Sequence, residues 1–549
     1  MRGLACLLAV TGLVFAQSRA PERSHGRSMV ISTRGIVATS QVLASQAGAM
    51  VLAKGGSAVD AAIAANAVLG LVEPMMCGIG GDLFVMYREA KTGQVVGLNA
   101  SGAAPRGMTV EALRAKGLKE MARTGIHSAT VPGCVRGWEA MHKRYGKLAW
   151  RELFSAAVRF AEEGFPVHEM TSVYWENAAL RKDAESARVF YPQGRAVRTG
   201  EMFRNPDLAR AMRSIAEGGA DSFYKGEVAR AILAASAKRG GLMTASDLAA
   251  FEPEWVTPVS TDYRGWKVYE LPPNGQGLAA LTMLNILETF PPGAYHSAAE
   301  LHRKIEAMKL AYADLRYVAD PLMVRVPVAG LISKEYARER AGRIDAAKAN
   351  CEVKAGSPPG GSSDTTYFSV VDREGNIASW IQSISGAWGA AVTVEGMGFP
   401  LHNRGAGFSF DAAHPNALKP GKRPFHTIIP AVVSHGDRHI GFGIMGGPNQ
   451  PLAHAQFVSY LADYGMNLQA ALEAPRFTKR AAEGCEVTVE NRFGVEALTG
   501  LSALGHRLTI MREYTTAMGR GNAVMWDAAS GVKYGASDPR TDGAAVPEP

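Results

Sequence analysis

The sequence predicts a mixed α/β (α+β) protein in which helices pack in layers against β-sheet. Of its 549 residues, 47% are hydrophobic and 20% are charged, close to the ~45–50% and ~25% usual for globular chains. Residues 130–320 carry mostly helical patterns, whereas strand patterns dominate residues 365–383 and return from residue 431 to residues 532–536. This distribution suits a layered fold with one large core.

Two helices and a strand pair are expected near the start of the chain. Ser40 is a candidate N-cap for a helix over residues 41–54, and Ser57 caps a helix over residues 58–71. The second helix is apolar nearly all round, which predicts deep burial. Strands are expected at residues 83–88 and 95–99. The glycines of residues 78–82 lack the spacing of a phosphate-binding loop, so close packing or a tight turn explains them.

Further helices are expected where periodic segments end in glycine or proline, at residues 152–163, 208–217, 227–239, 278–288 and 298–318. Residues 271–277 read as a turn rather than a domain linker. One break in composition lies at residues 354–363, which are rich in Pro, Gly and Ser. Such a segment packs poorly and tends to stay mobile.

The first 20 residues read as a secretory signal peptide. Arg2 precedes an apolar run over residues 4–15, and small-residue cleavage sites end at Ala16 and Ala20. The run is shorter than the ~20 residues that span a membrane. We therefore expect a secreted or periplasmic protein, with an uncleaved anchor as the alternative.

Charge and ligand patterns disfavour several functions. The formal net charge is +8, but the basic residues are scattered, so nucleic acid is not an expected partner. The 13 histidines lack HExxH spacing and the five cysteines lack CxxC spacing, so neither a metal nor a cofactor is predicted. Export permits disulfides, but the sequence assigns no pairing among Cys77, Cys134, Cys351 and Cys485.

A hairpin is predicted directly after the Pro/Gly/Ser segment, with strands at residues 365–371 and 377–383 and a turn between them. If Val371 pairs with Ile377, Thr365 lies opposite Ser383, and opposed residues share a face. Ser385 falls on the same face because side chains alternate along a strand. The hairpin would thus gather three hydroxyl groups.

A threonine hydroxyl needs a base to act as a nucleophile, and one known solution uses the α-amine of the same threonine. A free α-amine has a pKa of ~7.7–8.0, which suits a general base near neutral pH. Freeing the amine of Thr365 requires cleavage of the Asp364–Thr365 bond. Taken alone, the segment also fits an ordinary edge hairpin.

The chain as a whole resembles the γ-glutamyltransferase (γ-glutamyltranspeptidase, glutathione hydrolase) family of N-terminal-nucleophile hydrolases. The motifs that carry the resemblance are residues 35–82, 131–138 (VPGCVRGW), 309–314 (KLAYAD), 364–376, 422–424 (KRP), 446–447, 474–477 (APRF) and 534–540 (YGASDPR). The resemblance implies a four-layer αββα sandwich. It also implies cleavage into a large subunit, residues 21–364, and a small catalytic subunit, residues 365–549, which stay packed as one unit.

By the same resemblance, Thr365 is the nucleophile and Ser383, where the family usually has threonine, orients it. Gly446 and Gly447 match a diglycine whose backbone N–H groups form an oxyanion hole. Glycine suits this role because it lets the backbone approach the developing oxyanion closely.

The substrate pocket departs from the family. Ser385 stands in place of an asparagine, Arg404 in place of a glutamine, Gly407 in place of the acid that grips the substrate's α-amine, and His426-Thr427 in place of a serine pair. The family's arginine near residues 99–105 is missing, and only Arg106 lies close. Arg404 is predicted to bind a substrate carboxylate bidentately. The alternative is a structural arginine paired with Asp411 or Glu395.

These departures resemble an outlying branch that includes oxamate amidohydrolase and cephalosporin-acylase-like proteins. The leading prediction is a self-processing amide hydrolase or acyltransferase that acts through Thr365 and an acyl-enzyme on γ-glutamyl-type or related acyl amides, glutathione among them by family. One alternative is a non-γ-glutamyl acylase, such as an oxamate or glutaryl amide hydrolase. Another is true γ-glutamyl transfer with Glu395 or Asp411 as the amine anchor, and a further one is an inactive secreted binding or scaffold protein. The expected partners are a small-molecule amide and the two subunits of one precursor, with a homo-oligomer left open.

Overall fold

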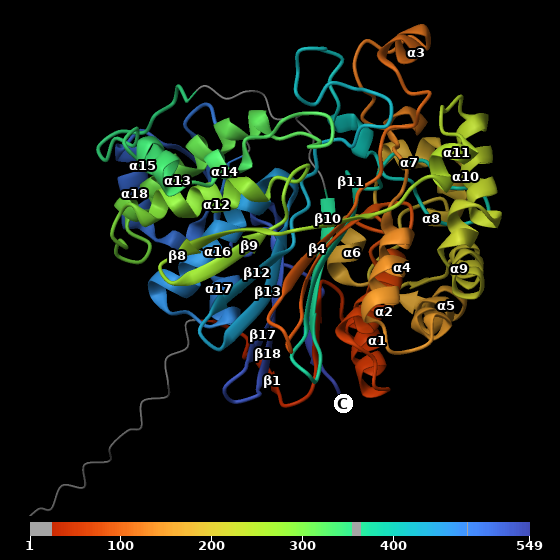
Figure 1. Ribbon diagram of the computed structural model, residues 1–549, viewed down its shortest axis with the longest axis horizontal. Coiled ribbons are helices and arrows are strands. Elements are labelled where there is room, and N and C mark those ends of the chain that lie inside the picture. The colour runs from red at the N-terminus through yellow and green to blue at the C-terminus, as the bar shows by residue number, and fades with distance from the viewer. Residues whose placement is uncertain (1–24, 354–363, 480) are drawn as a thin grey trace, which may run out of the picture.

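Two β-sheets lie face to face at the centre of the molecule, and helices cover the outer face of each (Figure 1). The computed structural model describes residues 25–353, 364–479 and 481–549. Within these residues, each of the two central sheets has seven strands. This order of layers confirms the αββα sandwich. The predicted signal peptide and the Pro/Gly/Ser segment lie outside the described residues.

The first central sheet, sheet I, is built around the predicted hairpin. Its turn is closed by Asp372, whose carboxylate accepts hydrogen bonds from the backbone and side-chain nitrogens of Asn376, both at 2.9 Å. The strands of sheet I, all antiparallel, follow in the order β19 (Ala544–Pro547), β2 (Ile36–Thr39), β10 (Asp364–Val371), β11 (Ile377–Ser385), β3 (Asp82–Arg88), β4 (Val95–Ala100) and β7 (Glu254–Val256).

The second central sheet, sheet II, is also antiparallel throughout. Its order is β1 (Val30–Ser32), β18 (Lys533–Ser537), β17 (Arg520–Asp527), β13 (Arg438–Met445), β12 (Ala431–His435), β9 (Trp266–Glu270) and β8 (Val259–Tyr263). Both sheets therefore combine strands from before and after residue 364.

Helices near the start of the chain cover sheet I. Every residue of α2 (Ala58–Val72) is buried, as its apolar sequence predicts, and Ser57 caps it in a capping box with Asp60. The predicted cap of α1 (Val42–Ala53) is wrong. Gln41 caps that helix through its side chain, because the Ser40 hydroxyl is engaged in a hydrogen bond to Glu73. The other longer helices on this side are α4 (Cys134–Tyr145), α5 (Ser155–Glu163), α9 (Pro206–Tyr224) and α10 (Glu227–Lys238).

Later helices cover sheet II (Figure 1). The predicted helix over residues 298–318 ends early, because α13 ends at Ala313 and continues as a 3-10 turn to Tyr317. Within α9, Gly219 has φ 65° and ψ −164°, which are not helical, so two helices meet there and the first ends at the predicted glycine pair. The strands β7 to β9 interrupt the segment predicted to be mostly helical. The main helices on this side are α12 (Gly277–Glu288), α13 (Ala298–Ala313), α15 (Lys334–Ala341), α16 (Gln450–Tyr464), α17 (Leu468–Glu473) and α18 (Val495–Ala503).

Short elements complete the described part of the chain. Two small sheets are formed by β5 (Phe165–Pro166) with β6 (Met202–Phe203), and by β14 (Phe477–Thr478), β15 (Glu486–Glu490) and β16 (Arg507–Met511). The short helices are α3 (Val110–Ala115), α6 (Glu169–Val173), α7 (Ala178–Lys182), α8 (Ala184–Phe190), α11 (Ala245–Ala249) and α14 (Val328–Leu331).

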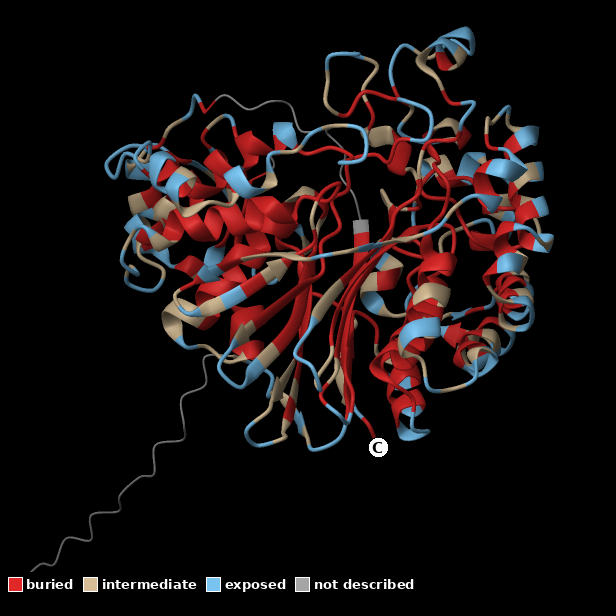
Figure 2. Ribbon diagram, viewed as in Figure 1, coloured by how far each residue is buried: buried red, intermediate tan, exposed pale blue. Residues whose placement is uncertain are grey.

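The two central sheets pack through a buried apolar interface (Figure 2). Gly443 on β13 permits this close approach, because a Cβ there would lie 2.4 Å from the ring of Tyr367 on β10. The strand that leads to the diglycine therefore lies directly across from β10, which carries Thr365 near its start. One cluster of this interface comprises Phe84, Met86, Leu271, Tyr367, Ile381, Ile428, Val432 and Met445, and a second comprises Ile36, Ala38, Val371, Ile377 and Val524.

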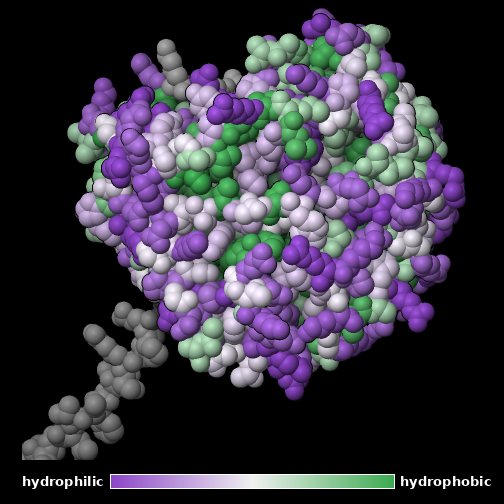
Figure 3. Space-filling view, viewed as in Figure 1, coloured by the Kyte–Doolittle hydropathy of each residue, from purple (hydrophilic) through white to green (hydrophobic). Residues whose placement is uncertain are grey.

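Covalent and surface features add two observations. Cys351 and Cys485 form a disulfide, while Cys77 and Cys134 are buried and unpaired. None of the described helices is long and apolar enough to cross a membrane. On the face shown in Figure 3, hydrophilic residues dominate the rim and hydrophobic residues gather towards the middle.

Candidate active site

Thr365 and Ser383 meet as the hairpin prediction requires. Val371 pairs with Ile377, and the register holds back to Thr366, which pairs with Gln382. A shift beyond that point sets the backbone of residue 364 opposite Ser385. The Thr365 and Ser383 hydroxyl oxygens lie 3.2 Å apart, and both residues are fully buried.

Ser385 holds Ser383 from the other side. Its backbone N–H donates to the Ser383 hydroxyl at 2.8 Å. Ser385 has φ 79°, in the left-handed region that few non-glycine residues adopt. Such strain clusters at sites where the surroundings fix the backbone. Two of the three predicted hydroxyls, those of Thr365 and Ser383, are thus in contact, whereas Ser385 joins them through its backbone nitrogen.

The opposite face of β10 is anchored in the layer of α1 and α2. The Thr366 and Ser40 hydroxyls donate to the same carboxylate oxygen of Glu73, at 2.8 and 2.6 Å. Burial raises the pKa of Glu73 even though these hydroxyls stabilise its charged form. On β11, the Gln382 amide clamps the backbone of Gly78 with two hydrogen bonds of 2.7 Å. These contacts hold β10 directly after Thr365 and hold the neighbouring strand β11 beside it.

Asp82 is a site residue that the sequence analysis missed. It pairs with Ser383 across β3 and β11, so its carboxylate shares a face with the Thr365 and Ser383 hydroxyls. Its oxygens accept hydrogen bonds from the backbone of Gly102 at 3.0 Å and from His426 Nε2 at 2.8 Å. His402 Nδ1 lies 3.1 Å away. Burial acts to raise the pKa of Asp82, but these two imidazoles outweigh it and hold the pKa well below its usual range.

Arg404 lies beside this carboxylate and is only 3% exposed. Its Nη1 donates to the Thr427 hydroxyl at 3.1 Å, and its Nε lies 3.7 Å from Asp82. Among the described residues, Nε and Nη2 have no hydrogen-bond partner. Burial lowers the pKa of Arg404 to about 10, so the guanidinium keeps its charge at neutral pH.

The predicted structural partners of Arg404 are wrong. Glu395 instead lies 2.9 Å from Arg239 and 3.3 Å from Lys238. The Asp411 carboxylate accepts a hydrogen bond from the backbone of Ala413, within its own loop. The acid that faces Arg404 is Asp82, which is distant in sequence and lies on strand β3 of sheet I.

His426 and Thr427 both lie in this cluster, as predicted. Burial and the charge of Arg404 lower the pKa of His426 to about 4, although Asp82 opposes this. The side-chain nitrogen of Asn274 lies 3.2 Å from His426 Nδ1 and 3.2 Å from the Ser101 hydroxyl. Ser101 in turn lines a cavity of about 500 Å³, whose rim includes the exposed Arg106.

The diglycine follows β13. Gly446 has φ 151° and Gly447 has φ 59°, so both adopt backbone conformations that glycine alone adopts readily. Gln276 donates to the carbonyls of Gly447 and Thr427, at 2.8 and 2.6 Å. This side chain therefore ties the diglycine to the segment that holds Arg404.

Gly407 ends the 3-10 turn that begins at Arg404. Its carbonyl accepts a hydrogen bond from Asn416 at 2.7 Å. A Cβ at this position would meet just one neighbour, the Phe425 carbonyl, at an ordinary 3.5 Å. The position has room for a side chain, yet the sequence places no acid there.

One buried histidine pair resembles a metal site. The ligand atoms of His302, Glu306 and His506 lie within 4.8 Å of one another. Both His302 nitrogens, however, are hydrogen-bonded, to His506 and to the Asp345 carbonyl, each at 2.8 Å. The ammonium nitrogen of Lys309 lies 2.6 Å from a carboxylate oxygen of Glu306. These hydrogen bonds and the ion pair use the atoms that would otherwise bind a metal ion.

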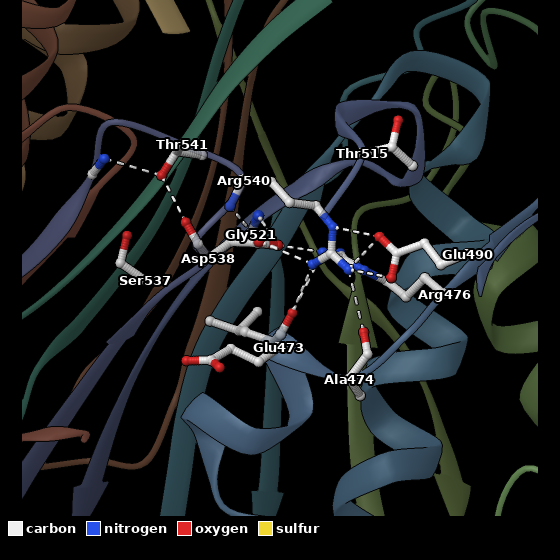
Figure 4. Close-up of polar contacts among 12 residues, drawn as sticks. Glu473, Ala474, Arg476, Glu490, Thr515, Gly521, Ser537, Asp538, Arg540 and Thr541 are labelled. Carbon is white, nitrogen blue, oxygen red and sulfur yellow. Dashed lines mark hydrogen bonds and ion pairs between the residues drawn. The ribbon is translucent and has the colours of Figure 1, made fainter. Parts of the chain in front are cut away.

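A second buried cluster explains two of the sequence motifs. Arg540 is hydrogen-bonded to both Glu490 oxygens, to Asp538 and to the carbonyls of Leu472 and Ala474 (Figure 4). Arg476 also contacts Asp538. The motifs at residues 474–477 and 534–540 meet here and tie α17 to sheet II.

The fold and this site define a class of protein. A four-layer αββα sandwich, with a buried threonine near the head of a central strand and a diglycine directly after the facing strand, is the architecture of the N-terminal-nucleophile hydrolases.

Comparisons with known proteins identify the family within that class. A family model described as gamma-glutamyltranspeptidase matches residues 44–548. The glutathione hydrolase-like YwrD proenzyme of Bacillus subtilis (strain 168) is 38% identical, over 94% of this chain and 99% of that protein. The oxamate amidohydrolase proenzyme of Klebsiella pneumoniae is 34% identical over the same shares. The crystal structure of cephalosporin acylase from Bacillus halodurans matches with a TM-score of 0.89 and 41% identity, over 97% of this chain and 99% of that one.

The chain belongs to the gamma-glutamyltranspeptidase family. It is an enzyme of the hydrolase and acyltransferase type that this family comprises, and its relatives fall in the branch that the sequence analysis indicates. Relatives named as proenzymes agree with a precursor that is processed into subunits.

Proposed function

We propose that this enzyme hydrolyses amides whose acyl group carries a distal carboxylate, after cleaving its own Asp364–Thr365 bond. Residues 21–364 form the large subunit and residues 365–549 the small one. Export by the first 20 residues belongs to the same proposal. The names of relatives that act on oxamate or cephalosporin-type substrates support it.

In this proposal the freed α-amine of Thr365 takes the proton of its own hydroxyl, and the oxygen attacks the amide carbonyl. The Ser383 hydroxyl, 3.2 Å away, orients the nucleophile, and the Ser385 N–H holds Ser383 in place. The backbone N–H groups of Gly446 and Gly447 stabilise the oxyanion, each donor being worth ~2.7–4 kcal/mol. Water then resolves the acyl-enzyme, or an amine does so in acyl transfer.

One observation carries the choice of substrate. Arg404 is buried and charged, yet its Nε and Nη2 find no hydrogen-bond partner in the described part of the chain. Leaving such donors unpaired is costly, and a carboxylate matches the geometry of a guanidinium. Because Gly407 offers no acid for an α-amine, an acyl group with a carboxylate alone fits better than a γ-glutamyl group.

The substrate choice is tested by comparing a glutaryl anilide with a neutral butyryl anilide. We expect Arg404→Ala to lower kcat/KM for the glutaryl substrate about 10- to 100-fold, because hydrogen bonds to a charged group contribute ~1.5–3 kcal/mol. The effect on the neutral substrate should be much smaller. Arg106→Ala, at an exposed arginine of the neighbouring cavity, is the matched control. Equal losses on both substrates would show that Arg404 is structural.

The nucleophile is tested by the reduced intact mass and by N-terminal sequencing. The wild type should give two chains, the smaller beginning at Thr365, and the larger beginning near residue 21 if the signal peptide is removed. Thr365→Ala should remain one chain and lose at least about 10³-fold in kcat, because a nucleophile acts as a unit with its base. Thr365→Ser keeps a hydroxyl and should still cleave. Two chains in the alanine variant would overturn the mechanism.

γ-Glutamyl hydrolysis or transfer is the second candidate, supported by relatives named glutathione hydrolase. It needs another acid for the α-amine, and Glu395 is already paired with Arg239. Turnover of a γ-glutamyl anilide faster than the glutaryl anilide, with transfer to an acceptor dipeptide, would favour this candidate.

A further inference from the structure

The disulfide joins two parts of the chain that the proposed cleavage would separate. Cys351 precedes the Asp364–Thr365 bond and Cys485 follows it, with a sequence separation of 134 residues. The chain on both sides is braced, because Gly484 N donates to the Cys351 carbonyl at 3.0 Å and Arg507 N donates to the Cys485 carbonyl at 2.8 Å. The two sulfur atoms thus lie on a rigid joint between the helical layer and the small sheet of β14 to β16.

The two cysteines differ in access. Cys351 is exposed, whereas Cys485 is fully buried. In thiol–disulfide exchange the attacking thiolate must reach one sulfur while the other leaves. Access therefore makes Cys351 the point of entry and Cys485 the leaving sulfur.

The charges around Cys485 favour the same direction. The ammonium group of Lys309, itself fully buried, lies 3.9 Å from Cys485 Sγ. Lys309 is held there by Glu306 at 2.6 Å and by the Asn350 carbonyl at 3.0 Å. Burial and the charge of Lys309 lower the pKa of the nearby Lys479 to about 8. A cation next to a cysteine stabilises the thiolate, and a more stable thiolate leaves faster, although Glu306 offsets part of the charge.

We propose that the Cys351–Cys485 pair is a thiol–disulfide exchange site for external thiols, and that in its oxidised form it covalently tethers the two products of self-cleavage. The thiolate of an external thiol attacks Cys351 Sγ and forms a mixed disulfide there. The Cys351–Cys485 bond breaks and its electron pair stays on Cys485, which becomes a thiolate beside Lys309. A second external thiolate then attacks the mixed disulfide, releases the oxidised external disulfide and leaves Cys351 reduced.

The tether rests on the proposed function, because the disulfide can join two products only if the chain is cut. The exchange site does not depend on the cut. Denaturing gels with and without reductant separate the two failures. We expect one band without reductant and two with it for the wild type, and one band in both lanes for Thr365→Ala. One wild-type band in both lanes would refute the cut. Two wild-type bands in both lanes would refute the tether. The double variant Cys351→Ser/Cys485→Ser should give two bands in both lanes.

The exchange site is tested on the native, full-length Thr365→Ala chain. The protein is exposed briefly to 2-mercaptoethanol, quenched with acid, alkylated with N-ethylmaleimide under denaturing conditions, and mapped by peptide mass. We expect the mercaptoethanol adduct on Cys351 and an increase of maleimide on Cys485, with the buried Cys77 and Cys134 unchanged by the pulse. An adduct on Cys485, or exchange that occurs only after unfolding, would overturn the proposal.

The role of Lys309 is tested by Lys309→Gln, which keeps hydrogen-bond donors for Glu306 and Asn350 but removes the charge. We expect exchange to slow by about threefold to tenfold, because the leaving thiolate loses its cation. An unchanged rate would refute the part assigned to Lys309. If this variant does not fold, the position of the adduct in the chain with Lys309 still decides the direction of attack.

Discussion

Arg404 and Arg540 are both deeply buried, yet their surroundings differ. Arg540 is hydrogen-bonded through all three guanidinium nitrogens to two acids and two backbone carbonyls (Figure 4). Arg404 makes one hydrogen bond, to Thr427, and stands 3.7 Å from Asp82. The first arrangement joins a helix to a sheet. The second leaves two donors unpaired among the described residues, beside the carboxylate of Asp82, which shares a face of sheet I with Ser383.

Unpaired donors alone do not mark a binding site. Arg476, a neighbour of Arg540, also has an Nε and an Nη1 without a hydrogen-bond partner among the described residues. What distinguishes Arg404 is its position, because Asp82 places it on the face of sheet I that carries Thr365. The comparison teaches that burial, incomplete pairing and nearness to the proposed nucleophile have to be considered together.

The largest expected difference between the two arginines is in stability. Arg540→Met leaves Glu490 and Asp538 buried without their main partner and should lower the free energy of unfolding by ~3–5 kcal/mol. Arg404→Met should cost less than ~2 kcal/mol, because His402, His426 and Gly102 still surround Asp82. Urea unfolding in the uncut Thr365→Ala background measures both. Equal losses of unfolding free energy in the two variants would show that the two arginines do not differ in their structural role.

The two clusters should also differ in acid. The pKa of His426 is lowered to about 4, against ~6.5 in an unfolded chain. Between these values the unfolded chain binds a proton that the folded one does not. Stability therefore falls as the pH drops from about 6.5 to 4, by up to ~3 kcal/mol from this residue. His439, whose pKa is also lowered to about 4, adds in the same direction.

The measurement is the unfolding free energy of the wild type and His426→Asn across that pH range. The variant should show a shallower acid-side slope, and His439→Asn, at a histidine outside the cluster, should flatten the slope independently, so the double variant should show the sum of the two changes. The Arg540 cluster has no histidine but holds a buried acid whose pKa Arg540 helps to lower, so Arg540→Met should raise the pKa of Asp538 and change the slope through a carboxylate instead. An unchanged slope in His426→Asn would contradict the assignment.

The smallest expected effect comes from placing a second acid beside Arg404. Residues three apart in a 3-10 turn are eclipsed, so an acid at position 407 would lie over residue 404. Gly407→Asp should lower kcat/KM for a glutaryl anilide by about tenfold, since the new carboxylate competes through bonds worth ~1.5–3 kcal/mol. By resemblance to the family, it should also raise the ratio of γ-glutamyl to glutaryl turnover. Gly407→Asn is the neutral control, and an unchanged ratio would separate Gly407 from the pocket.

The predictable part of the site is the part that depends on local sequence. The length of the turn and the alternation of residues fix the register of the hairpin, which brings Thr365 to Ser383. The N-cap at Ser57 and the burial of the helix after it were predictable in the same way, from the residue type at the cap and from the apolar sequence of the helix. The layers themselves were predicted through the resemblance rather than from periodicity.

The partner of Arg404 could not be predicted in this way. The candidates chosen, Glu395 and Asp411, were near it in sequence, whereas the acid beside it is Asp82, on a strand paired with β11. One signal in the sequence could have indicated Asp82 as a site residue, namely an acid at the end of a glycine run and at the start of a buried strand. That run was interpreted as a packing feature, correctly for Gly81, where a Cβ would lie 2.3 Å from the Ser383 carbonyl.

The edges of the two sheets bring distant ends of the described chain together. β19 pairs with β2, and Arg34 contacts the carbonyl of Pro549. A short linker from residue 549 to residue 30 would therefore permit a circularly permuted gene that starts at the codon for Thr365. In such a chain, removal of the initiator methionine would supply the free amine, and the catalytic machinery would mature without any self-cleavage.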